Sequence, residues 1–445
     1  MHSLSRARLL PLLISKEFRS LTTSRAWWLL LLLIGPLAGH SFITAVDLYA
    51  EASGIAGGPS ALAQGLSPLD GIFVPTFGAY DLAVTLLFPF VAIRVIAAER
   101  TSGAWKLMLQ SPAGVPAMLF AKAVALLMAW LLAWIPGLIA VLFWKLYGGW
   151  IAIPETLNLL LGHLLRMILA SGVAVAAAAL ANSVASAAIV TLGFTVGTWV
   201  LEFVAAGRGG WLQKAASFTP TSALRIFEQG MFRLSTVTVT LLLGLAGFTV
   251  AAIWLRQGDA PRVRWIRTGV AGAIFTMALY TASLPRAAWD VSENRRNSFP
   301  EADEAALRRI RDPLRITVYL AAEDPRRLDL DRNILSKVER ILPHVDIVYA
   351  ARSRSGLFEA PGDHYGEIWY EIDGRKQMSR STTERIVLEN LYQLAQVPTP
   401  SNSEVEPPGH PLPARPTGAA LLYYLAWPLA VALAAWLNFR TRTYS

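Results

Sequence analysis

The sequence alternates long apolar runs with short polar segments over most of its length. An α-helix needs about 20 apolar residues to cross the ~30 Å hydrocarbon core of a bilayer. Lipid leaves backbone polar groups without partners unless the chain is helical or forms a closed barrel. Apolar runs of helical length occur at residues 27–47, 76–98, 115–143, 157–181, 184–205, 234–255, 266–286 and 418–438. This pattern predicts eight transmembrane helices, with one long run of small residues divided in two at Ala181-Asn182-Ser183.

Residues 290–417, between the last two apolar runs, have the composition of a soluble domain. Residues 314–320 alternate apolar and polar positions as a β-strand does, and 345–349 have the same character. Between them, 331–342 carry Ile, Leu and Val at helical spacing. The order strand, helix, strand predicts a parallel pair of strands.

A hairpin and a second helix are expected later in the same stretch. Residues 367–372 and 375–378 flank Asp373-Gly374, which is a strong signal for a hairpin turn. Thr382 is expected to cap a helix over 383–394, whose leucines and isoleucine give it an apolar face. The stretch therefore reads as a small α/β domain.

The distribution of positive charge predicts the orientation in the membrane. The formal net charge is +9, and the positive-inside rule places short loops rich in Lys and Arg in the cytoplasm. Such residues gather before the first helix, after the second, after the sixth and in the tail: Arg6, Arg8, Lys16, Arg19, Arg25, Arg100, Lys106, Arg256, Arg262, Arg264, Arg267, Arg440 and Arg442. Residues 48–75 contain none, and 206–233, with Arg208, Lys214, Arg225 and Arg233, are the exception. We expect a multi-pass protein of the cytoplasmic (inner) membrane with both termini in the cytoplasm, and no nucleic-acid partner.

The expected fold is that of an α-helical polytopic membrane protein with a small extracytoplasmic α/β domain between helices seven and eight. Its parts are a six-helix membrane domain, a basic turn with the seventh helix, the α/β domain, a proline-rich semi-rigid linker, and the eighth helix with a cytoplasmic tail. Their expected ranges are, in that order, 1–256, 257–289, 290–397, 398–417 and 418–445.

A short amphipathic segment, residues 99–112, lies between the second and third apolar runs. We expect a helix there at the membrane surface, with Trp105, Leu107 and Met108 available to lipid or a partner. It is well placed to bind a soluble subunit and to transmit a conformational change of that subunit to the spans on either side. The residues expected to make this contact are Glu99, Arg100, Gly103, Trp105, Lys106 and Leu107.

An interfacial segment before the first span, with Lys16, Glu17 and Arg19, is expected beside residues 99–112. For Lys16 and Arg19 the alternative is an interfacial anchor whose charges reach the headgroups or fix the topology.

Three motifs, in this order, resemble the permease subunits of ABC-2 type ABC transporters, near their gliding-motility and nitrous-oxide-accessory branch. They are Lys16-Glu17-Phe18-Arg19-Ser20-Leu21, the Glu-Arg-x-x-Gly of Glu99 to Gly103 with its closing Ser111-Pro112, and residues 218–224. That family usually has Gly-Thr and an acidic residue after the glycine, where this chain has Ala104 and Lys106. The resemblance covers 1–256 and implies a separate ABC ATPase subunit and a homodimer or heterodimer of membrane subunits.

The rest of the chain resembles the auxiliary subunit of the gliding-motility type transporter. The likeness rests on residues 290–299, the Pro-Leu-Arg-Ile-Thr-Val-Tyr of 313–319 and Tyr365-Gly366-Glu367-Ile368. Members of that family usually continue into a further large soluble region, whereas this chain passes directly to its last apolar run. The resemblance implies a permease fused to a shortened auxiliary subunit.

The sequence offers no motif for catalysis. It has no Gly-x-x-x-x-Gly-Lys-Ser/Thr phosphate loop, no Gly-x-Ser-x-Gly elbow, no cysteine, and six scattered histidines without metal-ligand spacing. We therefore expect no catalytic, cofactor or metal site in this chain. ATP and Mg²⁺ are expected on the separate ATPase.

Several ionisable residues lie inside the predicted spans, where each costs roughly 2.5–3.5 kcal/mol on insertion scales. Those near the outer ends are His40, Asp47, Asp81, His163, Arg166 and Glu202. One interpretation is an outer polar vestibule containing His40, Asp47, Arg166 and Glu202. The alternative is that they pair, Arg166 with Asp47 or Glu202, or reach lipid headgroups.

Two further features concern helix packing. Pro89, Pro136 and Gly137 can break the second and third spans, either as hinges or to accommodate packing. Small residues dominate 170–188, which lets helices approach closely within the subunit or across a dimer.

The function expected from these features is that of the membrane subunit of an ATP-driven exporter or mechanical transducer, coupled to its ATPase through residues 99–110. The outer domain would bind cargo or an envelope partner, and the apolar core suits lipid-like or polypeptide cargo. The alternative is a membrane-anchored scaffold whose outer α/β domain, residues 290–396, recruits an envelope partner. A neighbouring gene for an ABC ATPase would favour transport.

Overall fold

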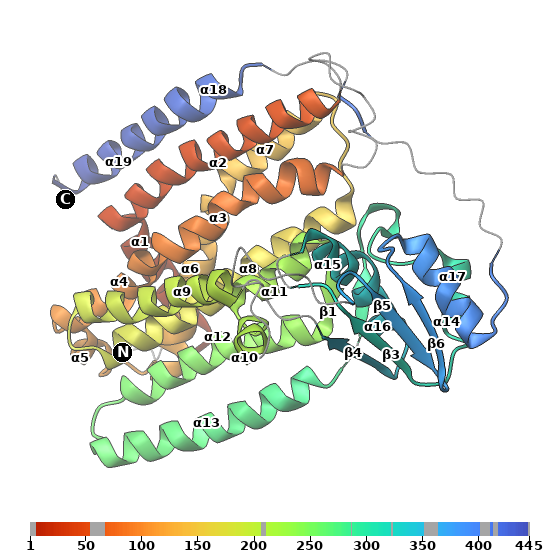
Figure 1. The fold of residues 1–445 in the computed structure, drawn as a ribbon. Coiled ribbons are helices and arrows are strands. Elements are labelled where there is room, and N and C mark those ends of the chain that lie inside the picture. The colour runs from red at the N-terminus through yellow and green to blue at the C-terminus, as the bar shows by residue number, and fades with distance from the viewer. Residues whose placement is uncertain are drawn as a thin grey trace, which may run out of the picture. The chain divides into compact units, whose positions relative to one another are not determined.

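A computed structural model of the chain describes residues 6–53, 67–205, 211–285, 287–321, 324–350, 364–400, 410–412 and 417–443. They form two compact units (Figure 1). The membrane unit comprises Met1–Trp199, Pro220–Val291 and Pro408–Ser445, and the second unit comprises Val200–Thr219 and Ser292–Pro407. Most of the linker expected at 398–417 lies outside the described residues, as does Arg208.

Among the described residues, seven helical stretches are long and apolar enough to cross a membrane. They are Arg25–Ala52, Leu69–Thr101, Val115–Leu146, Ile153–Leu180, Val184–Ala205, Leu234–Trp254 and Ala419–Arg440. The chain is therefore a multi-pass helical membrane protein. The remaining expected span, 266–286, falls on a regular helix, α13 (Pro261–Ser283), that is not among the seven. The eighth span thus stays a prediction.

The membrane unit is built from helices and one short two-stranded ribbon. Its elements are α1 (Arg6–Thr22), α2 (Arg25–Ala52), η2 (Leu69–Phe73), α3 (Val74–Leu86), α4 (Phe88–Thr101), α5 (Ala104–Met108), α6 (Val115–Ala133), α7 (Ile135–Leu146), α8 (Ile153–Leu180), α9 (Val184–Ala205) up to Trp199, α11 (Pro220–Glu228), β1 (Met231–Arg233), α12 (Leu234–Trp254), α13, β2 (Ala288–Asp290), α18 (Ala419–Leu421), η5 (Leu422–Ala426) and α19 (Trp427–Thr443). The predicted boundary at 181–183 is confirmed, because α8 ends at Leu180 and α9 begins at Val184.

Both predicted helix breaks are present. Helix α3 gives way to α4 next to Pro89, and α6 gives way to α7 next to Pro136. At the second break the Gly137 amide donates to the Tyr80 hydroxyl at 2.8 Å, and the Tyr423 hydroxyl donates to the Pro136 carbonyl at 2.8 Å. A proline-containing break is tolerated inside a membrane where side chains satisfy the freed backbone groups in this way. These contacts favour a fixed kink at Pro136.

Helices α8 and α12 approach each other closely through glycines. A Cβ atom added to Gly172 on α8 would lie 2.3 Å from the carbonyl oxygen of Gly244 on α12. Membrane helices have no hydrophobic drive to associate, so they rely on this kind of close backbone packing. The small residues predicted to form a packing face at 170–188 thus act within the subunit at this point.

Helices α12 and α13 form an antiparallel hairpin. Strand β1 directly precedes α12 and β2 follows α13, and the two strands pair antiparallel with Met231 opposite Asp290. At the other end, residues 255–260 join the helices, and Trp254 contacts Trp265 edge to face with ring centroids 5.1 Å apart. The two helices therefore run side by side over their length (Figure 1).

The C-terminal helix packs on α2 through two glycine notches. Cβ atoms added to Gly35 and Gly39 would overlap the rings of Trp427 and Tyr423, at 2.0 Å and 2.2 Å from their nearest atoms. The Trp427 indole N–H also donates to the Leu31 carbonyl at 2.8 Å. Figure 1 shows α18 and α19 running along α2. The final span therefore belongs to the membrane unit's packing.

The second unit contains a four-stranded sheet in the order β4-β3-β5-β6. Its elements are α10 (Trp211–Ala216), η3 (Glu293–Arg295), α14 (Glu301–Leu307), β3 (Leu314–Val318), α15 (Pro325–Leu330), η4 (Asp331–Leu335), α16 (Ser336–Ile341), β4 (Val345–Tyr349), β5 (Ile368–Ile372), β6 (Arg375–Ser379) and α17 (Glu384–Ala395). Its apolar core brings Ile316 and Tyr370 of the sheet together with Val338, Val387 and Leu391 of the helices.

The local predictions for this unit are confirmed, with one correction. Strands β3 and β4 pair in parallel, and β5 and β6 form the antiparallel hairpin. The turn residues Asp373 and Gly374 both have positive φ, 48° and 75°, as a tight hairpin turn requires. The cap predicted at Thr382 is wrong, because Thr383 is the N-cap residue of α17 and its side chain makes no capping hydrogen bond.

We predict that Gly172→Ala destabilises the protein by about 1–3 kcal/mol, the usual cost of overpacking a well-packed contact. The added methyl group would meet the backbone of α12, which cannot move aside as a flexible side chain can. Thermal unfolding of the purified full chain in detergent measures the change. The matched control is Gly193→Ala on α9, where a Cβ has nothing within 4 Å. Equal melting temperatures for the two variants would contradict the close packing.

Candidate functional site

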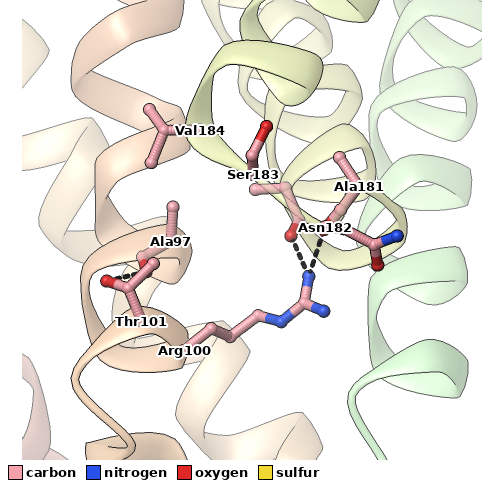
Figure 2. Close-up of a pocket in the computed structure, with 8 residues that line it drawn as sticks. Ala97, Arg100, Thr101, Ala181, Asn182, Ser183 and Val184 are labelled. Atoms are coloured by element: carbon pink, nitrogen blue, oxygen red, sulfur yellow. Dashed lines mark hydrogen bonds between the residues drawn. The ribbon is translucent and has the colours of Figure 1, made fainter.

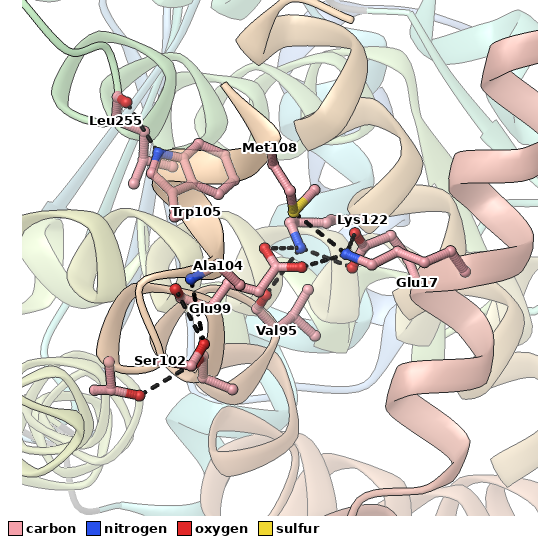
Figure 3. A network of polar contacts seen from close by, with 12 residues as sticks. Glu17, Val95, Glu99, Ser102, Ala104, Trp105, Met108, Lys122 and Leu255 are labelled. Carbon is pink, nitrogen blue, oxygen red and sulfur yellow. Dashed lines mark hydrogen bonds and ion pairs between the residues drawn. The ribbon is translucent and has the colours of Figure 1, made fainter. Parts of the chain in front are cut away.

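The amphipathic segment forms a junction of several helices. Helix α4 ends at Thr101, and α5, a helix of five residues, begins after Gly103. Gly103 has φ 76°, a left-handed conformation that glycine adopts without steric cost. The sharp turn there carries the chain from the transmembrane helix directly into α5, and it places Glu99, Trp105 and Met108 close together (Figure 3).

Four charged side chains meet at this junction, from α1, α4 and α6 (Figure 3). The Lys122 ammonium lies 2.7 Å from Glu17 Oε2 and 2.7 Å from Glu99 Oε2. The Lys16 ammonium lies 2.8 Å from Glu17 Oε1 and 2.5 Å from Glu99 Oε1. We call these four residues the ion cluster. The charges of its two cations and two anions cancel, and each carboxylate contacts both lysines.

Burial differs sharply within the ion cluster. The side chains of Lys122 and Glu17 are 0% and 3% exposed, Glu99 is 13% exposed, and Lys16 is 46% exposed. The Lys122 ammonium donates hydrogen bonds to Glu17 Oε2 and, at 3.0 Å, to the Val95 carbonyl, and it forms an ion pair with Glu99. A buried charge is tolerated only when paired and hydrogen-bonded in this way. Removing one partner would leave an uncompensated charge.

Lys16 closes the open side of the ion cluster. Burial lowers the pKa of the Lys16 ammonium, but hydrogen bonds to the Glu17 and Glu99 carboxylates outweigh it, so the pKa lies above its usual value. The same ammonium lies 3.3 Å from the Met108 sulfur on α5. Lys16 is therefore held as a cation against both α4 and α5.

Arg100 binds the C-terminal end of α8. Its guanidinium donates to the carbonyls of Ala178, Ala179 and Ala181, at 2.5, 3.0 and 2.8 Å. The last carbonyls of a helix have no partner within the helix, and a cation there also interacts favourably with the helix dipole. Figure 2 shows the side chain reaching from α4 to this helix end, beside a small pocket of about 140 Å³.

Trp105 binds the C-terminal end of α12. Its indole N–H donates to the Leu255 carbonyl at 3.1 Å, and the side chain is only 4% exposed. The expectation that Trp105 is available to lipid or a partner is therefore wrong, because the ring is used to cap α12. On the same short helix, Lys106 and Leu107 are exposed, with Leu107 at 69%.

The junction thus divides the residues predicted for coupling into two groups. Glu99, Arg100 and Trp105 bind other helices, whereas Lys106 and Leu107 face outward. Of the N-terminal residues, Glu17 is buried and Arg19 is exposed. Lys122, at the centre of these contacts, is not part of the sequence motifs. The available signal was a lysine within an apolar run, where an unpaired charge is costly.

Two of the four residues considered for an outer vestibule, Arg166 and His40, have partners in other helices. Arg166 on α8 pairs with Asp81 on α3, and it also donates to the Thr85 hydroxyl at 3.0 Å. The structure therefore gives Arg166 a partner other than the Asp47 or Glu202 considered from the sequence. His40 on α2 lies 3.2 Å from the Tyr424 hydroxyl. Asp47, on α2, and Glu202, on α9, are both partly buried.

Comparison with known proteins gives no match: no protein-family model, no curated protein and no solved structure matches the chain.

We predict that Lys122→Met destabilises the full chain by about 3–5 kcal/mol, the usual cost of leaving buried carboxylates without their cation. Lys16→Met, the matched control, removes the more exposed lysine and should cost clearly less. Thermal unfolding of both variants in the same detergent measures the difference. Equal destabilisation by the two substitutions would show that burial of Lys122 does not organise the ion cluster.

Proposed function

We propose that this chain is the membrane subunit of an ATP-driven transporter of the ABC-2 type, acting as an exporter or mechanical transducer. In this proposal a separate ABC ATPase hydrolyses ATP and presses on the segment 99–110. The observation that supports it is the construction of the junction. The short helix α5 exposes the basic side chain of Lys106 and the apolar side chain of Leu107, while Trp105 of α5 and Arg100 of α4 bind the ends of two other helices.

Each polar contact of the junction can transmit a displacement of α5 or α4 to another helix. Glu99 and Lys122 join α4 to α6, and Glu17 brings in α1. Arg100 joins α4 to the end of α8, and Trp105 joins α5 to the end of α12. A force applied to α5 at Lys106 and Leu107 would reach all of these helices, because their buried polar contacts are costly to break.

The hairpin of α12 and α13 supports the eighth span. Paired strands hold the start of α12 beside the end of α13, and the short turn at 255–260 holds their other ends together. A helix that lies beside a spanning helix over its whole length crosses the same depth of membrane. Val263, Ile266, Val270, Ile274 and Met277 of α13 are exposed, as lipid-facing residues are. With α13 as a span, both termini are cytoplasmic and the α/β unit is extracytoplasmic.

The proposed assembly has an ABC ATPase on the cytoplasmic side and two membrane subunits, identical or different. The extracytoplasmic α/β unit would bind the cargo or an envelope protein. The scaffold alternative differs in needing no ATPase, and the experiment below separates the two.

We predict that the tagged full chain, purified in mild detergent from its own cells, retains a stoichiometric ABC ATPase with measurable ATP hydrolysis. Leu107→Glu should remove the ATPase, because it places a carboxylate on the exposed face of α5. The control is Leu146→Glu at the end of α7, an equally exposed leucine (71% against 69%), which should retain it. Loss in both variants, or no ATPase with the unchanged chain, would contradict the proposal. Recovery of envelope proteins alone would support the scaffold.

Cysteine labelling tests the orientation, since the chain has no cysteine of its own. Single cysteines at Gln257, in the turn between α12 and α13, and at Arg385, at the start of α17, occupy exposed positions. With an impermeant maleimide applied to cells whose outer envelope is permeable, we expect Arg385→Cys to react. Gln257→Cys should react only after the membrane is opened. Equal reaction of both from one side would show that α13 does not cross.

A further inference from the structure

An apolar groove lies between α2 and α19, near the start of α2. Its lining residues are Arg25, Trp28, Leu29, Leu32, Val431, Ala432, Ala435 and Phe439. Its volume is about 350 Å³, within the range of ~300–1,000 Å³ typical of ligand pockets. Both helices belong to stretches that are long and apolar enough to cross a membrane, and the lining residues Leu29 and Phe439 are exposed on the protein surface.

The packing of α19 on α2 explains why the groove is there. The glycine notches at Gly35 and Gly39 bring the helices together where Trp427 and Tyr423 fill them. One to three turns nearer the start of α2, the residues facing α19 are Trp28, Leu29 and Leu32, and the facing residues of α19 include Ala432 and Ala435. Large side chains on α2 opposite small ones on α19 leave a furrow with apolar walls.

Polar donors gather at the end of this groove that lies by the start of α2. Arg25, the first residue of α2, is exposed and has no ion-pair partner among the described residues. The Trp28 indole N–H is buried and has no hydrogen-bond acceptor within the described part of the chain. The Ser24 hydroxyl caps the Trp27 amide, but the first turn of α2 contains no acidic residue to offset the positive end of the helix dipole.

We propose that this groove binds an anionic phospholipid. The phosphate lies at the start of α2, bound by the Arg25 guanidinium and the Trp28 indole N–H, at the positive end of the helix dipole. One acyl chain lies along Leu29, Leu32, Val431 and Ala435. The apolar furrow and the cationic mouth match the two parts of a phospholipid, and a buried donor without an acceptor is satisfied by the phosphate.

The test uses the full chain, stripped of lipid in detergent and titrated with palmitoyl-oleoyl phosphatidylglycerol or the matching phosphatidylcholine. Native mass spectrometry reads the adducts. We expect one phosphatidylglycerol site at least about fivefold tighter than for phosphatidylcholine, the preference that one basic residue near a membrane surface confers. Arg25→Gln should abolish the preference and leave phosphatidylcholine binding unchanged. Trp28→Phe should weaken phosphatidylglycerol binding several-fold.

Two further variants locate the site. Ala435→Trp fills the groove and should weaken binding of both lipids, while Arg19→Gln, an exposed arginine on α1 that does not line the groove, should keep the preference. Equal loss in Arg19→Gln and Arg25→Gln would show a diffuse basic surface and overturn the proposal. So would unchanged binding in Ala435→Trp. If the unchanged chain binds no phosphatidylglycerol and Ala435→Trp converts a dimer to a monomer, a second copy of the chain fills the groove instead.

Discussion

The buried ammonium of Lys122 is the constraint on which the junction depends. A lysine that is wholly removed from solvent inside a membrane protein needs anionic partners, and here two carboxylates supply them, with one backbone carbonyl as a further acceptor. Glu17 comes from α1 and Glu99 from the end of α4, so pairing with Lys122 fixes three helix segments against one another. Helix α1 is therefore part of the folded core at this point.

The same junction satisfies the ends of two further helices. Arg100 and Trp105 supply donors to carbonyls at the ends of α8 and α12, where the helices themselves leave acceptors unpaired. Because residues 99–105 provide both these caps and one arm of the ion cluster, α4 and α5 are attached to four other helices within a few residues of chain. Trp105 looks like a lipid-facing residue in sequence but is needed as a donor inside the structure.

Patterns that depend on neighbouring residues could be predicted, and contacts between distant residues could not. The division of the small-residue run at 181–183 and the Asp373-Gly374 hairpin follow from local apolar periodicity and turn chemistry. The pairing of Glu17 with Lys122 joins residues 105 positions apart, and no local pattern encodes it. The sequence offers several carboxylates as partners for Arg166, and only the packing of α3 on α8 shows that the partner is Asp81. The residues of α13 alone likewise do not decide whether this helix spans the membrane. The pairing of β1 with β2 favours a span, because it holds α13 beside α12.

The kinks and the junction together restrict how the proposed machine can move. Hydroxyl groups from Tyr80 and Tyr423 satisfy the backbone at the Pro136 break, so bending there would expose a buried amide and a buried carbonyl. The hydrogen bond from Trp105 to the end of α12 and the contact of Lys16 with Met108 oppose local unfolding of α5 in the same way. A displacement of α5 is therefore transmitted most cheaply as a rigid-body tilt of the attached helices, with α4, α6, α8 and α12 moving together. The proposed coupling then depends on the integrity of the ion cluster as much as on the exposed face of α5.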